Sequence, residues 1–257
     1  MRFCRFMASG SDTPIYGIAE GDSVVEIIGV PWGNWTKAAR RYEAPGCRLL
    51  APVEPSKIVC VGRNYAAHVA ELGNEMPKEP LIFLKPPSAI IGPGETIEIP
   101  PYSKRVEHEG ELGVVIGKRC ARVKEQEKAL DYVLGYTCVN DVTARDLQKA
   151  DVQFTRGKGF DTFFPVGPHI ETDLDPKDVL VETRVNGGLR QSGRTSLMAF
   201  PVEYLVRWIS LMMTLMPGDV IATGTPAGVG PLVEADEVEV SVEGIGVLRN
   251  AAHCAVE

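Results

Sequence analysis

Three glutamates at alternate positions are the residues of this chain best suited to hold a metal ion. Glu107, Glu109 and Glu111 precede the apolar segment 112–116, and side chains two apart on a strand point to the same face. Carboxylates that lie side by side repel one another and are costly to bury. A hard divalent cation, Mg²⁺ or Mn²⁺, prefers oxygen ligands and removes both costs. Taken alone, an edge strand with a solvated acidic face is the commoner explanation of this pattern.

Asp141 is the natural third oxygen ligand of such a site. It follows the apolar segment 136–139, where a predicted strand gives way to a predicted helix. Functional residues are frequent at such connections. An aspartate in this place also suits the N-cap of the helix, so the residue pattern leaves both roles open.

His68 and Glu71 form a second pair of chemically capable side chains. They are three residues apart in a predicted helix and therefore share one face. A carboxylate beside an imidazole orients the ring and makes it a usable general base, although a surface pair has the same spacing. Lys158 stands between two glycines, an arrangement that suits either the close approach of a ligand or a simple turn.

Composition and charge exclude several classes of function. The 257 residues are 44% hydrophobic and 24% charged, which is typical of a globular protein. A formal net charge of −7 argues against a nucleic-acid partner. The apolar segment 209–216 is too short to cross a membrane, and residues 1–10 lack the apolar stretch of a signal peptide. We therefore expect a cytoplasmic protein with no membrane contact, whose six cysteines, without CxxC spacing, are free thiols.

The order of predicted elements indicates a small N-terminal domain, residues 1–53, followed by a large domain, residues 54–257. The proline-containing stretch at 52–55 suits a boundary. Many short strands with few helices predict an α+β fold that is predominantly β. The predicted strands are 15–19, 23–28, 57–62, 81–84, 96–100, 106–117, 136–139, 179–185, 219–222 and 237–242; the predicted helices are 64–72, 123–132, 142–151 and 201–213.

Several short motifs occur along the chain in a specific order. They are GRNYAAHVAE at 62–71, FLKP at 83–86, HEGELGVVIG at 108–117, NDVTARDLQ at 140–148, KGFD at 158–161, VNG at 185–187, PGD at 217–219 and TGTP at 223–226. Each motif alone is weak, but together and in this order they resemble the fumarylacetoacetate hydrolase family. The resemblance extends from about residue 57 to about residue 246.

The resemblance implies a fold and a metal site. The family's catalytic domain is a mixed β-sandwich roll with few helices, and members are commonly homodimers with a small N-terminal domain. The resemblance assigns Mg²⁺ or Mn²⁺ to Glu109, Glu111 and Asp141 and leaves Glu107 as a neighbour. It also makes His68 and Glu71 a catalytic pair on a short lid helix.

The resemblance also implies further site residues and a substrate class. Lys158 is expected in the catalytic group, and the substrate-binding residues are expected to be Arg63, Lys85, Arg145, Gln148 and Thr225. The substrate would be a small anionic 2-oxo acid. The favoured activity is hydrolysis of a C–C bond in an acylpyruvate-like acid through an enolate. The alternatives are an oxaloacetate decarboxylase, a 2-hydroxyhepta-2,4-diene-1,7-dioate isomerase and a non-catalytic scaffold homologue.

Overall fold

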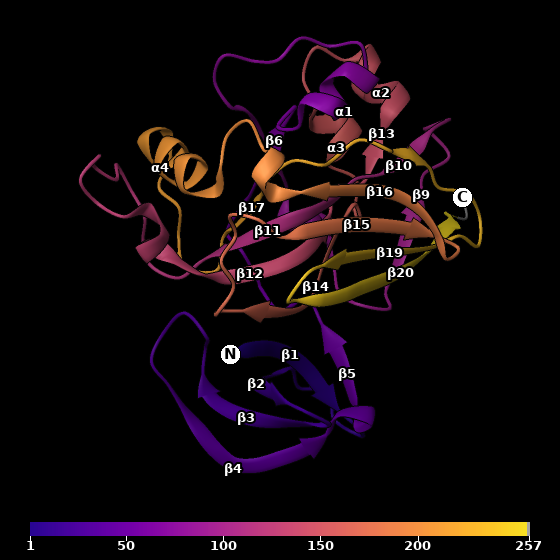
Figure 1. The fold of residues 1–257 in the computed structure, drawn as a ribbon. Coiled ribbons are helices and arrows are strands. Elements are labelled where there is room, and N and C mark those ends of the chain that lie inside the picture. Colours follow the sequence, from indigo (N-terminus) through magenta and orange to yellow (C-terminus); the bar gives the residue numbers. More distant parts are fainter. Residues whose placement is uncertain (256–257) are drawn as a thin grey trace.

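The computed structural model describes residues 1–255, which form three β-sheets and four short α-helices. The largest sheet has twelve strands and runs through both parts of the molecule (Figure 1). This architecture confirms the predicted α+β, predominantly β fold. The strands of the large sheet are β1 (Arg2–Ala8), β2 (Ile15–Glu20), β3 (Ser23–Gly29), β4 (Trp35–Glu43), β5 (Cys47–Leu50), β6 (Ile58–Gly62), β7 (Leu81–Lys85), β8 (Ile90–Ile91), β11 (Gly110–Ile116), β12 (Val133–Asn140), β14 (Phe164–Glu171) and β17 (Val220–Ala222).

Two smaller sheets and the helices complete the fold. The three-stranded sheet consists of β10 (Val106–His108), β13 (Thr143–Ala144) and β18 (Gly230–Pro231); the five-stranded sheet consists of β9 (Thr96–Ile99), β15 (Leu180–Val185), β16 (Gly188–Arg194), β19 (Glu237–Val242) and β20 (Gly246–Cys254). The helices are α1 (Ala66–Glu71), α2 (Arg145–Ala150), α3 (Thr155–Lys158) and α4 (Val202–Met212), with 3₁₀ turns at Ala44–Gly46, Pro87–Ala89, Ala129–Tyr132 and Thr195–Leu197. Helices α1, α2 and α3 gather at the end of the molecule opposite β1–β5 (Figure 1).

Strands β1 to β5 form the N-terminal unit, at the bottom of Figure 1. The predicted strands at 15–19 and 23–28 are confirmed as β2 and β3. Strands β1, β4 and β5 were not predicted. Strand β4 exposes most of its side chains, so it lacks the alternating apolar pattern that marks a half-buried strand. The division at residue 53 lies between β5 and β6 and stays a prediction.

Backbone pairing joins the N-terminal unit to the rest of the molecule, and a buried carboxylate holds the segment that follows the unit. Strand β1 pairs antiparallel with β14, with Arg2 opposite Glu171. Asp219, completely buried, accepts hydrogen bonds from the backbone of Ser56 (2.9 Å), its hydroxyl (2.7 Å) and the backbone of Lys57 (3.1 Å). The connecting segment is thereby fixed to the turn before β17.

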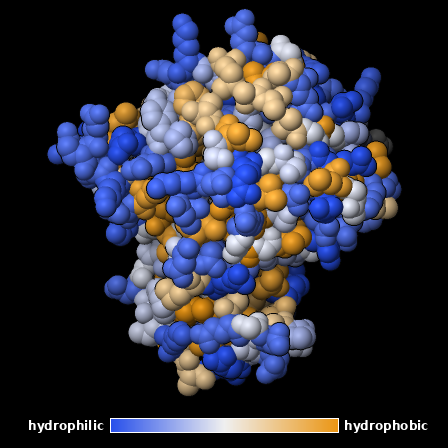
Figure 2. Space-filling model, in the orientation of Figure 1, coloured by the Kyte–Doolittle hydropathy of each residue, from blue (hydrophilic) through white to orange (hydrophobic). Residues whose placement is uncertain are grey.

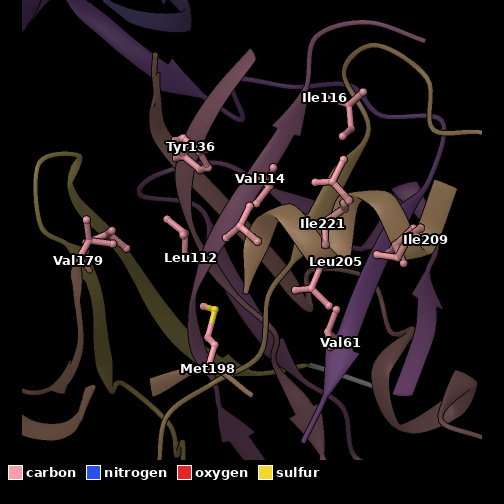
Figure 3. Packing of buried hydrophobic residues seen from close by; sticks show 14 of the residues in the cluster. Val61, Leu112, Val114, Ile116, Tyr136, Val179, Met198, Leu205, Ile209 and Ile221 are labelled. Carbon is pink, nitrogen blue, oxygen red and sulfur yellow. The ribbon is translucent and has the colours of Figure 1, made fainter. Parts of the chain in front are cut away.

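The main hydrophobic core lies between the large sheet on one side and helix α4 with the five-stranded sheet on the other. All seven residues of β11 are buried, with Val114 in the core on one face of the sheet and Val115 in the core on the other. This explains why residues 112–116 are continuously apolar rather than alternating. Leu205 and Ile209 of α4 face the sheet near Ile221 and Val61 (Figure 3). This packing holds β6 and β11, whose ends carry the site described below.

The predicted strand 106–117 is wrong in one respect that matters for function. It is divided at Glu109 into β10 and β11, which belong to different sheets. The break is fixed by the following segment: the backbone amide of Asp141 donates to the carbonyl of Glu109 (2.8 Å), and the side-chain oxygen of Asn140 accepts from the amide of Glu109 (2.9 Å). Glu107, Glu109 and Glu111 therefore do not occupy one face of a continuous strand.

Two predicted helices also differ from the structure. The predicted helix 123–132 is wrong, because only a 3₁₀ turn at Ala129–Tyr132 forms there. The predicted helix 142–151 begins later, at Arg145, after the short strand β13. No side chain caps α2, so the N-cap alternative for Asp141 is also wrong. The predicted helix at 201–213 is confirmed as α4.

The visible surface carries polar and apolar residues side by side, without one dominant apolar band (Figure 2). Among the described residues, no helix combines the length and the apolar character needed to cross a membrane.

Candidate active site

Three buried carboxylates form a compact oxygen-ligand group at the point where β10, β11 and β12 meet. Glu109 lies between β10 and β11, Glu111 lies in β11 and Asp141 follows β12. One oxygen from each of the three lies within 4.8 Å of the others, and all three residues are buried. Within residues 1–255 this is the one such group of three potential ligands. The structure thus brings together the three residues predicted as metal ligands.

A lysine and an arginine compensate part of the negative charge of this group. The ammonium of Lys158 is 2.7 Å from Glu109 Oε2 and 2.7 Å from Asp141 Oδ2. Although burial opposes the effect, Lys158 and Arg145 lower the pKa of Glu109 below its ordinary value. Burial, together with Asp141 and Glu109, raises the pKa of Glu111 well above its ordinary value. The site is therefore short of positive charge around Glu111.

The donor set fits a hard divalent cation. Only oxygen ligands converge there, as Mg²⁺ and Mn²⁺ prefer. Glu111 uses one oxygen to accept from the backbone amide of Gly224 (2.7 Å), and such an outer contact fixes the orientation of a ligating carboxylate. A cation would supply the positive charge that Glu111 lacks.

Lys85 lies behind the carboxylates rather than in front of them. Its ammonium donates to Asp141 Oδ1 (2.6 Å) and to the carbonyls of Val142 (2.9 Å) and Phe163 (2.7 Å). All three of its donors are therefore in use, and its side chain is fully buried and does not line the cavity described below. In the structure Lys85 positions Asp141 and has no free donor for the substrate contact that the sequence predicted.

Arg145 connects Glu107 to the ligand group. Its guanidinium contacts Glu109, lies 2.6 Å from Glu107 Oε2 and donates to Gln148 Oε1 (2.6 Å). Glu107 is also paired with Arg105, so it faces arginines and not the metal-ligand group. Arg145 therefore orients Glu109, as a planar guanidinium with several fixed donors can do.

The predicted catalytic pair is assembled on α1. His68 Nδ1 is 3.1 Å from Glu71 Oε2. Glu71 also accepts from the backbone amide of Gly228, at 3.0 and 3.2 Å from its two oxygens. Since a carboxylate only accepts, Nδ1 of His68 carries the proton, and Nε2 of a neutral ring is then free to accept one. Helix α1 is thereby fastened to the loop that follows β17.

These groups surround one cavity of about 280 Å³. Its lining includes nine of the predicted site residues: Arg63, His68, Glu109, Glu111, Asp141, Arg145, Gln148, Lys158 and Thr225. Glu71 and Lys85 do not line the cavity, but they contact His68 and Asp141, which do. Sequence reasoning missed Asn74, Phe83, Lys149 and Phe154, which also line the cavity. Lys149 could have been predicted from the sequence, because Arg145, Gln148 and Lys149 have the spacing of residues on one face of a helix.

Arg63 adopts an unusual backbone conformation at the edge of the cavity. Its φ is 58°, which is uncommon for a residue other than glycine and is often found at functional sites. The next residue, Asn64, is completely buried and holds this turn by donating to the carbonyls of Thr223 (2.7 Å) and Phe200 (3.0 Å). Within residues 1–255 the Arg63 guanidinium makes no salt bridge, so its charge is free to meet a ligand.

Comparison with known families agrees with this geometry. Residues 57–252 match the family described as fumarylacetoacetate (FAA) hydrolase C-terminal, and residues 1–52 match the Rv2993c-like N-terminal family. The first match covers more than half of the chain. The chain therefore belongs to the fumarylacetoacetate hydrolase family, as its motifs predicted.

Individual relatives extend over nearly the whole chain. It is 41% identical to oxaloacetate tautomerase YisK of Bacillus subtilis over 254 residues, 91% of this chain and 84% of the relative. The crystal structure of 5-carboxymethyl-2-hydroxymuconate delta-isomerase from Mycobacterium smegmatis is 49% identical, with a TM-score of 0.92 and coverage of 99% and 100%. Maleylpyruvate hydrolase from Sphingobium sp., solved with manganese(II) and pyruvate, is 31% identical, with a TM-score of 0.82 and coverage of 100% of both chains.

The manganese in the Sphingobium structure and the oxygen-ligand group of this chain together suggest a divalent metal. These relatives are a tautomerase, an isomerase and a hydrolase, so the family to which this chain belongs consists of enzymes with several activities.

Proposed function

We propose that this chain is a divalent-metal-dependent enzyme that interconverts the enol and keto forms of a small 2-oxo dicarboxylic acid. The observation that carries the proposal is the convergence of three buried carboxylates and the His68–Glu71 pair on one cavity of about 280 Å³. The proposed cation is Mg²⁺ or Mn²⁺ on Glu109, Glu111 and Asp141. When bound, it supplies Lewis-acid polarisation of the substrate's oxo group.

His68 has the protonation pattern that enol–keto conversion needs. Its Nδ1 is held by Glu71, and its Nε2 is the free acceptor. In the keto-to-enol direction Nε2 takes a proton from the carbon beside the oxo group, and the imidazolium then gives that proton to the oxo oxygen, so that the ring ends neutral. The reverse direction returns a proton to carbon. Glu71 stabilises the imidazolium that forms in between, as an orienting carboxylate does for a general base.

Free cations support the assignment of a dicarboxylic substrate. Arg63 and Lys149 line the cavity, and within residues 1–255 neither makes a salt bridge. Lys158, in contrast, is already paired with two carboxylates. A second carboxylate on the substrate would pair with the free cations at the cavity edge. The cavity volume lies at the small end of ligand sites, which favours a short-chain acid.

Hydrolysis of an acylpyruvate-like acid is the second candidate. The same His68–Glu71 pair would activate a water instead of moving a substrate proton. The 31% identity to a maleylpyruvate hydrolase supports it. The higher identities to a delta-isomerase and a tautomerase favour proton transfer, which is why hydrolysis is placed second.

The test follows enol absorbance in the ultraviolet with purified protein in dilute buffer, with and without Mg²⁺. Oxaloacetate and acetylpyruvate are the two substrates. We expect metal-dependent acceleration of the decay of enol oxaloacetate without release of CO₂. Conversion of acetylpyruvate to acetate and pyruvate would replace the proposal by the hydrolase, and CO₂ release would replace it by the decarboxylase. Inertness towards both acids, without a metal-induced rise in melting temperature, would favour a scaffold.

A further inference from the structure

Gln191 is a completely buried amide outside the predicted site that connects three parts of it. It lies in β16. Its oxygen is 2.9 Å from His108 Nδ1 and 3.0 Å from the backbone nitrogen of Gly110. Its nitrogen is 2.7 Å from Thr225 Oγ1 and 2.7 Å from the carbonyl of Pro226. The amide thus makes four hydrogen bonds, which use both acceptor positions of its oxygen and both N–H donors of its nitrogen.

Two of these contacts determine which end of the amide is which. A backbone N–H can only donate, so the atom facing Gly110 is the oxygen of Gln191. A backbone carbonyl can only accept, so the atom facing Pro226 is the nitrogen. It follows that Gln191 donates to Thr225 Oγ1 and that Nδ1 of His108 donates to the Gln191 oxygen.

The polarity of Thr225 follows from these directions. Its hydroxyl accepts one bond from Gln191 (2.7 Å) and lies 2.9 Å from the carbonyl of Gly110. Because that carbonyl cannot donate, the single proton of the hydroxyl is used on Gly110. A hydroxyl has one proton and two lone pairs, so one lone pair remains for the cavity that Thr225 lines.

We infer that Gln191 is a positioning residue that makes Thr225 a hydrogen-bond acceptor towards the bound acid, and thereby selects ligands with a hydroxyl over ligands with only oxo and carboxylate oxygens. This inference rests on the proposed function, since it concerns the same cavity. The enol of a 2-oxo acid carries such a hydroxyl and the keto form does not. Thr225 therefore stabilises the enol form relative to the keto form.

A matched pair of acids separates this role from general binding. Lactate and pyruvate differ at the 2-position, where lactate has a hydroxyl and pyruvate an oxo group. Both are titrated calorimetrically into the full chain with saturating Mn²⁺. We expect Thr225→Val to weaken lactate binding by about five-fold, the effect of losing one neutral hydrogen bond. The affinity for pyruvate should stay within about two-fold of the wild type. The conservative variant Thr225→Ser should keep the lactate affinity.

The second variant removes the positioning residue while keeping Thr225. In Gln191→Met the hydroxyl is free to turn and donate to the ligand. We expect the ratio of lactate to pyruvate affinity to fall by about five-fold or more, with pyruvate binding equal or tighter. The melting temperature of each variant reports on folding. If Gln191→Met does not fold, the comparison of Thr225→Val with Thr225→Ser still decides the matter.

Different failures have different meanings. An equal loss of both acids in Thr225→Val, or an unchanged ratio in a folded Gln191→Met, would overturn the inference and leave the proposed function in place. If the wild-type chain bound neither acid with Mn²⁺, this inference would be overturned, while the proposed function, which concerns a dicarboxylic acid, would still be decided by the enol-decay assay.

Discussion

The N-terminal unit and the region around the cavity use charge in opposite ways. In β1–β5 charged side chains stay near solvent, as in the pairs that Glu20 makes with Lys37 and Arg41. Among the residues that the structure describes, none of the buried polar or charged side chains belongs to positions 1–53. Around the cavity, Lys85 and Asp141 are both almost completely buried.

The difference indicates which charges are kept for function. Exposed ion pairs contribute little to stability. Buried pairs cost desolvation energy, and apolar residues of similar volume often replace them without loss. A dense buried network of this kind is therefore poorly explained by stability alone. It is explained by a site that must hold carboxylates in fixed positions, and variants in the two regions should differ accordingly.

The largest expected effect is that of Asp141→Ala. This change removes one of the three carboxylates and leaves the ammonium groups of Lys85 and Lys158 without their shared partner. We expect metal-dependent turnover to be abolished and the Mg²⁺-induced rise in melting temperature to disappear. Activity and thermal unfolding, each measured across a Mg²⁺ titration, provide the check. Full activity in this variant would remove Asp141 from the proposed metal site.

His68→Ala should lower kcat by about 1000-fold, within the range of general acid–base catalysis. The imidazole does not belong to the three-carboxylate group, so the apparent affinity for Mg²⁺ should stay within about two-fold of the wild type. Steady-state kinetics and thermal shifts measured on the same preparation separate the two properties. A parallel loss of metal affinity would contradict the division of roles.

Lys85→Met tests the buried network directly, with Lys37→Met as its matched control in the N-terminal unit. Loss of the Lys85 ammonium leaves Asp141 buried and only partly compensated, and we expect destabilisation of about 3–5 kcal/mol. The Lys37 side chain is 53% exposed, so its replacement should leave the urea midpoint unchanged. Equal effects of the two substitutions would remove the contrast between the regions.

The smallest expected effect concerns pH and His169 in β14. Burial, with a contribution from Arg2, lowers the pKa of His169 below its ordinary 6.5. At a pH just below 6.5, His169 binds a proton in the unfolded chain but not in the folded chain. The free energy of unfolding therefore falls as pH drops below about 6.5, and this histidine has no effect on it at higher pH. His169→Gln should make the urea midpoint less dependent on pH between 5 and 7.

Much of the site was predictable because its residues lie in short, ordered motifs. The spacing of His68 and Glu71, and the position of Asp141 after an apolar strand, required no knowledge of distant contacts. The structure places these residues where such a site needs them, while their catalytic and ligand roles stay predictions to be tested by the variants above.

The parts that were missed depend on contacts between distant segments. The break at Glu109 arises from hydrogen bonds to Asn140 and Asp141, which local alternation cannot reveal. The full occupation of the Lys85 donors depends on carbonyls at residues 142 and 163. Gln191 lies 34 positions from Thr225, and nothing in the local sequence of β16 marks it as a neighbour of the cavity.

The pairing of β1 with β14 has a consequence for the behaviour of a shortened chain. Removal of residues 1–53 would leave the paired end of β14 with unsatisfied backbone donors and acceptors. Exposed strand edges recruit other strands, so a catalytic fragment of this kind would be prone to self-association and aggregation. The N-terminal unit contributes no residue to the lining of the cavity, but its strand β1 covers an edge of β14 that would otherwise be open to pairing with another chain.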